Sequence, residues 1–159
     1  MIQKVKGKKY LINGGLGMIG STIAKILVEA KAEVTIVDAM IKPFGANLFN
    51  IEEIKDRVKT RFFDIKDTEK MKKEIKGKDV ILNLAGQVAH NDSIVNPLYD
   101  AKMNYLYQLN IMECIRQVNP NAKTVFSGSR LQFGKIENVP VDESHTSFPE
   151  TPYALHKQA

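Results

Sequence analysis

The sequence predicts an α/β fold in which a doubly wound parallel β-sheet is covered by helices. Short apolar segments alternate along the chain with segments that have helical spacing. The segment EVTIV at 33–37 is apolar nearly throughout, as expected for a strand with helices on both faces of its sheet. A glycine-rich turn, GGLGMIG at 14–20, joins the first apolar segment directly to an amphipathic helix. These three observations together favour the α/β class.

Five strands are expected, at 10–13, 33–37, 58–63, 79–84 and 123–126. The intervening segments predict a helix at 18–30, a short helix at about 51–56, a charged segment at 67–76 that stops at Gly77, and a long helix at 97–118. Right-handed crossovers and a switch point beside the first strand give the strand order 3-2-1-4-5. The fifth strand is then an open edge, which favours pairing with another segment or aggregation.

The long helix at 97–118 has two apolar stripes. The first consists of Leu98, Ala101, Tyr105, Leu109 and Met112, and the second of Met103, Tyr107, Ile111 and Cys114. A helix that is apolar on two sides is expected to be buried on two sides. One side is expected to cover the sheet, and the other needs another helix or a second subunit.

Length and composition predict one domain over residues 1–159, with 43% hydrophobic and 26% charged residues. The net charge is +5, but the basic residues are dispersed, so a nucleic-acid partner is not expected. Cys114 is the single cysteine, which suits a reducing compartment. No apolar run is long enough to cross a membrane, and no His, Cys, Asp and Glu residues have metal-ligand spacing. We therefore expect a cytoplasmic protein without a metal.

The glycines of the turn indicate a Rossmann-type site for a dinucleotide. Gly15, Gly17 and Gly20 fit the pattern G-x-G-x-x-G, and Gly14 with the last two fits G-x-x-G-x-x-G. Such glycines allow a positive φ, close approach of the backbone to a ligand, and close packing of the helix on the strand. The N–H groups that begin the helix would then face a pyrophosphate. The alternative is a purely structural glycine turn.

Asp38 ends the second strand, eighteen residues after Gly20. A carboxylate there can accept both hydrogen bonds from an adenosine ribose and would repel a 2′-phosphate, which favours NAD over NADP. The alternative is an aspartate that only caps or stabilises a turn.

Tyr153 and Lys157 lie four residues apart, so a helix would place them on one face. A free tyrosine phenol, with a pKa of about 10, is a poor base at neutral pH. A lysine ammonium and a nicotinamide cation nearby would favour the phenolate. Ser129, after the fifth strand, can hydrogen-bond the same substrate oxygen while Tyr153 removes a hydroxyl proton.

These motifs resemble the extended short-chain dehydrogenase/reductase family, in particular the N-terminal part of its NAD-dependent nucleotide-sugar epimerases and dehydratases, and most closely the UDP-glucose 4-epimerase-like members. The matching segments are GGLGMIG at 14–20, Asp38, Asp64-Ile65, NLAG at 83–86, SGSRLQFG at 127–134 and YALHK at 153–157.

The resemblance implies that Tyr153 is the catalytic base, that Lys157 holds the nicotinamide ribose and tunes Tyr153, and that Ser129 is the catalytic serine. It implies that NAD contacts Gly14, Gly17, Met18, Ile19, Gly20, Asp38, Asp64, Ile65, Leu84, Ala85, Gly86, Tyr153 and Lys157. The substrate implied is a nucleotide sugar. The function expected is epimerisation, with a dehydratase, a reductase or a catalytically silent NAD-binding module as alternatives.

Family members are about twice as long, so the resemblance implies an incomplete NAD-binding domain that ends inside the Tyr153 helix. It also implies a homodimer formed through the helix at 97–118 and the Tyr153 helix. Dehydratases of the family carry Thr-Asp-Glu where this sequence has Gly128-Ser129-Arg130, which argues against dehydration.

Other polar residues have weaker interpretations. Arg130 and Gln132 are expected either to face the substrate or to lie exposed in a loop. His90 follows the fourth strand and can face substrate or cofactor, whereas His145 and His156 are expected on the surface of a loop and a helix.

Overall fold

The computed structural model describes residues 4–159, so the first three residues of the predicted 1–159 domain lie outside the described residues. The chain forms two compact units. The first unit runs to Gly86 and resumes at Leu109–Ser127, and the second consists of Gln87–Gln108 and Gly128–Ala159. That one domain spans the chain stays a prediction.

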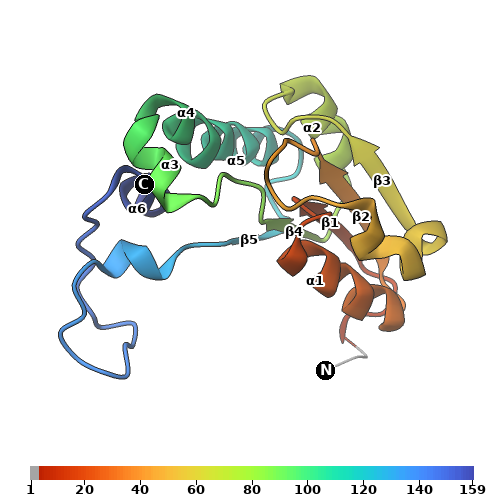
Figure 1. Ribbon diagram of the computed structural model, residues 1–159. Helices are drawn as coiled ribbons and strands as arrows, with labels where there is room; N and C mark the ends of the chain where they lie inside the picture. The colour runs from red at the N-terminus through yellow and green to blue at the C-terminus, as the bar shows by residue number, and fades with distance from the viewer. Residues whose placement is uncertain (1–3) are drawn as a thin grey trace. The chain divides into compact units, whose positions relative to one another are not determined.

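The first unit contains a five-stranded sheet in the predicted order β3-β2-β1-β4-β5, in which all neighbouring strands are parallel (Figure 1). Its strands are β1 Lys9–Asn13, β2 Glu33–Asp38, β3 Val58–Phe62, β4 Val80–Asn83 and β5 Lys123–Phe126. This is the Rossmann-type fold that the sequence predicts. Because the strands are parallel, their carboxyl ends share one edge of the sheet, where ligands bind in such folds. Val125 and Phe126 of the outermost strand, β5, are exposed.

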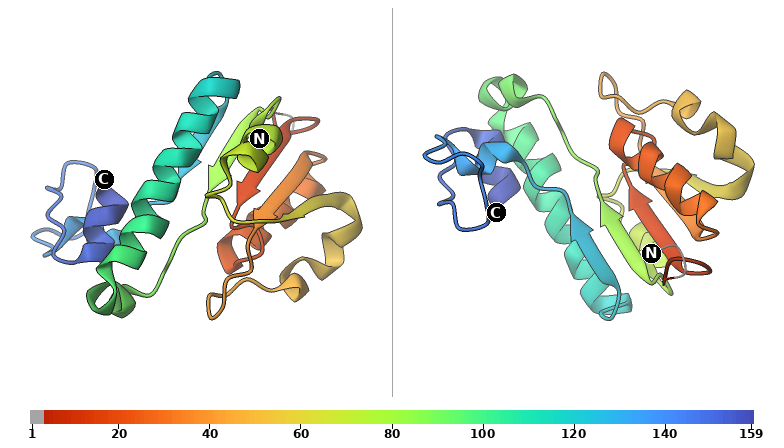
Figure 2. Two further views of the ribbon diagram at one scale, coloured as in Figure 1. Left: turned by 90° about the horizontal axis from the view of Figure 1, so that it is seen from above. Right: turned by 90° about the horizontal axis from the view of Figure 1, so that it is seen from below.

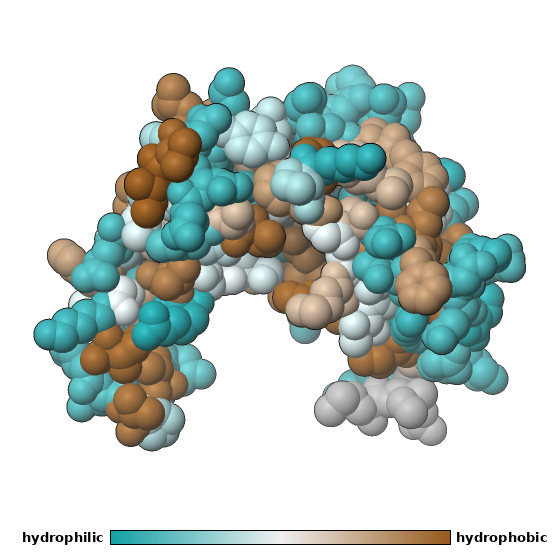
Figure 3. Space-filling model, viewed as in Figure 1, coloured by the Kyte–Doolittle hydropathy of each residue, from teal (hydrophilic) through white to brown (hydrophobic). Residues whose placement is uncertain are grey.

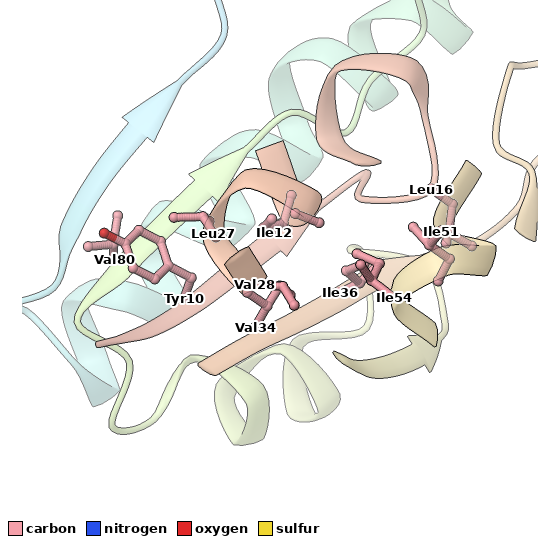
Figure 4. Close-up of a cluster of buried hydrophobic side chains, with 11 residues drawn as sticks. Tyr10, Ile12, Leu16, Leu27, Val28, Val34, Ile36, Ile51, Ile54 and Val80 are labelled. Carbon is pink, nitrogen blue, oxygen red and sulfur yellow. The ribbon is translucent and has the colours of Figure 1, made fainter. Parts of the chain in front are cut away.

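Helices cover both faces of this sheet, as Figure 2 shows for α1 Met18–Glu29 on one face and α2 Thr68–Ile75 with α5 Tyr107–Val118 on the other. On the face of the sheet that α1 covers, every second strand residue is buried, among them Tyr10, Ile12 and Ile36 (Figure 4). The residues alternate because successive side chains of a strand point to opposite faces. The 3₁₀-helix η2 Leu48–Arg57 adds Ile51 and Ile54 to the same core. Each such buried side chain stabilises the fold by roughly 1.5–3 kcal/mol.

The η2 segment is longer than the short helix predicted at about 51–56, and it is a 3₁₀-helix. It begins after Asn47, whose side-chain oxygen accepts a hydrogen bond from the Phe49 N–H at 2.9 Å. Asparagine is one of the residues that satisfy the free N–H groups at the start of a helix in this way.

The second unit contains four short helical elements and a π turn. These are α3 His90–Val95, α4 Pro97–Ala101, the π turn η3 Lys102–Leu106, the 3₁₀-helix η4 Arg130–Phe133 and α6 Pro152–Gln158. The helix predicted at 97–118 is therefore α4, the π turn and α5 in succession. Of its two predicted stripes, Met103, Ile111 and Cys114 of the second are buried, whereas Leu98, Leu109 and Met112 of the first are exposed.

Candidate functional site

The glycine turn of the first unit is held by close backbone packing. Gly14 has φ +77, which favours glycine, and a Cβ atom there would lie 2.8 Å from the backbone nitrogen of Ala85. A Cβ atom at Gly20 would overlap the Gly14 carbonyl oxygen. The packing of the protein itself therefore requires glycine at both positions.

Gly17 differs from these two glycines. A Cβ atom there would have the Gly14 carbonyl oxygen as its nearest neighbour, at an ordinary contact distance of 3.5 Å. Gly17 precedes α1 and caps it without a side-chain hydrogen bond, and the side chains of Met18 and Ile19 are exposed. The first N–H groups of a helix lack acceptors within that helix and attract anions. The space beside Gly17 thus fits a phosphate group, as dinucleotide binding requires.

Asp38 lies beside this turn and is nearly buried. One carboxylate oxygen, Oδ2, accepts a hydrogen bond from the Leu16 N–H at 3.0 Å, and Oδ1 accepts one from the Met40 N–H at 2.8 Å. Asp38 therefore stabilises the turn through its side chain, which is the structural role given above as the alternative to ribose binding. Each carboxylate oxygen retains a further acceptor site, so ribose binding remains compatible with these contacts.

The remaining predicted cofactor residues of the first unit follow β3 and β4. Asp64 accepts a hydrogen bond from the Lys66 N–H through Oδ1 at 3.0 Å. Ile65 is buried, and its carbonyl oxygen accepts a hydrogen bond from the Asn110 side chain at 3.1 Å. The Leu84 N–H donates to the Asn13 carbonyl oxygen at 3.0 Å, which places Leu84, Ala85 and Gly86 directly after β4 at the carboxyl edge of the sheet.

In the second unit, α6 carries Tyr153 and Lys157, and their exposed fractions are only 8% and 7%. Thr151 caps the helix by accepting a hydrogen bond from the Ala154 N–H at 3.3 Å. The Tyr153 N–H donates to Ser93 Oγ at 3.1 Å, and Ser93 itself donates to the His90 carbonyl oxygen at 2.7 Å. The first turn of α6 is thus bound to α3.

Ser129 is linked to the same helix through Gln132. The Ser129 N–H donates to Gln132 Oε1 at 2.6 Å, and Gln132 Nε2 donates to the Lys157 carbonyl oxygen at 3.2 Å. Ser129 Oγ accepts a hydrogen bond from the Leu131 N–H at 3.3 Å, so Ser129 and Gln132 form a capping box for η4. Gln132, predicted to lie at the substrate or in an exposed loop, instead joins the Ser129 turn to α6.

Burial lowers the pKa of the Lys157 ammonium, and the Asp100 carboxylate partly offsets this effect. Asp100 is fully buried and pairs with His156, with 2.7 Å between Asp100 Oδ1 and His156 Nδ1. The prediction that His156 lies on the helix surface is wrong, because the imidazole is mostly buried against Asp100. Neither Asp100 nor Ser93 belongs to a motif, so the sequence does not indicate them.

The predicted site residues are therefore divided between the two units. The cofactor positions from Gly14 to Gly86 belong to the first unit, and Ser129, Tyr153 and Lys157 belong to the second. Among residues 4–159, no group of three or more His, Cys, Asp or Glu side chains is arranged to hold a metal ion. None of the described helices combines the length and apolar character that a membrane crossing requires.

Comparison with known protein families gives a match to the model of the family described as GDP-mannose 4,6 dehydratase, over residues 11–159. The chain belongs to this family. Among curated proteins, a UDP-glucose 4-epimerase of Streptomyces lividans is 30% identical over 156 residues, which cover 95% of this chain and 45% of that protein. The chain thus spans about half the length of the curated relatives that it matches.

Solved structures of related proteins share the fold. A UDP-N-acetylglucosamine 4-epimerase from Methanobrevibacter ruminantium M1, in complex with UDP-N-acetylmuramic acid, has a TM-score of 0.87 and 28% identity, over 96% of this chain and 48% of that one. A dTDP-glucose 4,6-dehydratase from Streptomyces venezuelae, with NAD bound, has a TM-score of 0.86 and 23% identity, over 94% and 48% of the two chains. A GDP-mannose 4,6-dehydratase of Yersinia enterocolitica is 30% identical over 161 residues, which cover 94% of this chain and 43% of that protein, so the sequence relatives of this chain include both epimerases and dehydratases.

Proposed function

We propose that this chain is the NAD-binding half of a nucleotide-sugar epimerase, with Tyr153 as the catalytic base. The observation that carries this proposal is the arrangement of the second unit, where Gln132 joins the Ser129 turn to the helix of Tyr153 and Lys157. A buried phenol and a buried ammonium on one helix are suited to removing a proton from a sugar hydroxyl. The space beside Gly17 in the first unit supports binding of the pyrophosphate of NAD.

Each residue has a distinct role in the proposed reaction. Tyr153 takes the proton of the sugar hydroxyl and later returns one, and Ser129 hydrogen-bonds the reacting oxygen. Lys157 holds the nicotinamide ribose, and its positive charge favours the tyrosine phenolate. The glycine turn at 14–20, Asp38 and Lys157 would hold NAD, which would supply reversible hydride transfer to and from the sugar, so that no net oxidation results.

Cofactor choice is assigned to Asp38. Its carboxylate is proposed to accept hydrogen bonds from the adenosine ribose and to repel a 2′-phosphate. Asp38→Ala should weaken NAD binding at least about tenfold, because a bonding partner worth roughly 1.4 kcal/mol or more is lost. Calorimetric titration of the chain with NAD and with NADP measures this, with exposed Asp56→Ala as the matched control. Unchanged NAD affinity in Asp38→Ala would refute the assignment.

The epimerase assignment competes with a dehydratase, a reductase and a catalytically silent NAD-binding module. Dehydratases of the family that this sequence resembles use an acidic pair to eliminate water. This pair is absent from Gly128-Ser129-Arg130, which favours the epimerase. Isomerised sugar at constant NAD supports an epimerase, release of water a dehydratase, and consumption of NADH a reductase. For the 159-residue chain alone, we expect NAD binding without turnover.

Turnover is therefore to be measured in a longer protein, in which this chain is followed by a C-terminal half of family length. Tyr153→Phe removes the proposed base and should reduce turnover about a hundred- to ten-thousandfold, the range of general-base effects. The exposed Tyr105→Phe is the control. Near-normal turnover in Tyr153→Phe would exclude Tyr153 as the base.

We also propose that two copies associate through the helical segment 97–118 and α6. Exposed apolar side chains support this, because Leu98 is 76% exposed and Leu106 and Leu155 are also exposed. Figure 3 shows apolar atoms on the surface over α3 and α4. Leu98→Glu should convert the dimer into a monomer in sedimentation analysis, and a wild-type monomer would disprove the proposal.

A further inference from the structure

The short helix α6, which carries both Tyr153 and Lys157, depends on its surroundings for its position. It has seven residues, and helices of this length are unstable in isolation. Its polar contacts include Ser93 at its first turn, Gln132 at the Lys157 carbonyl, and Asp100 at the His156 side chain. Only the last of these involves a charged group.

Asp100 is the last but one residue of α4, and its exposed fraction is 0%. Oδ1 lies 2.7 Å from His156 Nδ1, and Oδ2 accepts a hydrogen bond from Asn104 Nδ2 at 2.9 Å. Asn104 also donates to the Gln87 carbonyl oxygen at 3.0 Å. A buried carboxylate is costly unless hydrogen bonds and a nearby positive charge compensate it. Both oxygens of Asp100 have hydrogen-bonding partners, His156 Nδ1 and Asn104 Nδ2.

His156 connects this carboxylate to the residues of the proposed reaction. It precedes Lys157 directly and follows Tyr153 by three residues, so it lies between them on α6. A carboxylate at Asp100 only accepts hydrogen bonds, and in the tautomer that suits it His156 Nδ1 is the donor. The contact of His156 with Asp100 joins α6 to α4.

We propose that Asp100 is a positioning residue for the reaction: through His156 it sets the orientation of α6, and its negative charge supports the buried Lys157 ammonium. The inference rests on the proposed function of Tyr153 and Lys157, because a fixed orientation matters only if they react. Neither Asp100 nor His156 contacts the substrate in this proposal. The Asp100 carboxylate partly offsets the lowering of the Lys157 pKa by burial, which agrees with the second role.

The charge is tested in the 159-residue chain itself. Lysine ¹³C NMR follows the titration of Lys157, whose signal is assigned by its loss in Lys157→Arg. In Asp100→Asn the midpoint should move down by about one pH unit, since an opposite charge nearby shifts a pKa by about 1–3 units. Glu113→Gln, which removes an exposed carboxylate in the other unit, is the matched control and should leave the midpoint unchanged. An unchanged midpoint in folded Asp100→Asn would overturn the role of the charge.

The orientation is tested by turnover in the longer protein. His156→Leu should lower kcat about 10- to 100-fold with KM within about threefold, because a misplacement of about 1 Å costs about 10²-fold in rate. His156→Asn keeps an N–H donor at the position of Nδ1 and should recover most of the rate. Normal kcat in His156→Leu would overturn the positioning role, even if Asp100→Asn does not fold. Turnover retained in Tyr153→Phe would instead refute the proposed function, while the Lys157 titration would still test the charge.

Discussion

The two units hold their predicted functional residues in opposite ways. In the first unit, the turn at 14–20 is shaped by backbone packing and supported by an apolar core of strand and helix side chains. In the second unit, α6 is held by hydrogen bonds to the side chains of Ser93, Asp100 and Gln132, of which the first two are buried. The glycine turn therefore depends on close backbone packing, whereas the position of α6 depends on individual hydrogen bonds.

This difference determines how each site should respond to mutation. A tightly packed backbone turn is destabilised when an added side-chain atom overlaps its neighbours, but it tolerates most changes in the side chains around it. A polar network fails when one partner is removed, because the remaining buried group loses its hydrogen bond and costs about 1–3 kcal/mol. The predictions below test this contrast.

The largest effect is expected at Gly14. Gly14→Ala should destabilise the chain by about 3 kcal/mol, because it combines a positive φ with overlap onto the Ala85 backbone. Gly17→Ala is the matched variant and should cost no more than about 1 kcal/mol, the usual loss at a helix cap. Urea unfolding measures both changes.

Gly17→Ala should nevertheless weaken NAD binding at least about tenfold, because its methyl group would occupy the space assigned to the phosphate. If Gly17→Ala binds NAD normally, the turn does not receive a pyrophosphate. If it destabilises the chain as much as Gly14→Ala does, the contrast between the two glycines fails.

A smaller effect is expected at Gln132 in the second unit. Gln132→Leu leaves the Ser129 N–H and the Lys157 carbonyl oxygen without their partner and should destabilise the helix end by about 1–2 kcal/mol. Hydrogen exchange of the α6 amides should become about 5- to 30-fold faster, the factor that corresponds to this free energy. Gln117→Leu, which removes an exposed hydrogen bond to Glu113, should leave these amides unchanged. Equal α6 exchange in the two variants would contradict the role of Gln132.

The sequence predicts the first unit better than the second because regular patterns define it. Strand order, the glycine turn and the end of β2 at Asp38 follow from periodicity and spacing. The six-residue helix α3 is too short to show helical periodicity, and the π turn at Lys102–Leu106 has no sequence pattern that distinguishes it from a continuous helix.

Polar contacts of the second unit are also invisible to local patterns. Asp100 and His156 are separated by 56 residues, and each reads as an ordinary surface residue of a helix. Only the fold brings them together. Ser129, Tyr153 and Lys157 were identified through a motif, whereas the residues that hold them in place were not.

The smallest effect is expected at an exposed charge of the first unit. Hydrogen bonds from Arg116 and Gln117 lower the pKa of Glu113 to about 2 from an ordinary value of 4.5. A carboxyl group whose pKa is lowered on folding stabilises the protein above its unfolded pKa, and this contribution is lost as the pH falls from about 4.5 to about 2. Because the pair is exposed, solvent and salt screen it.

Glu113→Gln should therefore reduce the urea midpoint slightly at pH 7, and the difference from wild type should disappear near pH 2 and in high salt.

The charge of Lys157 affects stability in the opposite direction from that of Glu113, because burial lowers the pKa of this base. Its charge therefore opposes folding at neutral pH, and this cost decreases as the pH rises from the folded pKa toward 10.5. Comparison of Lys157→Met with wild type by urea unfolding at pH 7 and pH 10 measures this dependence. A Glu113→Gln effect that exceeds the Lys157→Met effect would contradict the view that buried charge matters most in the second unit.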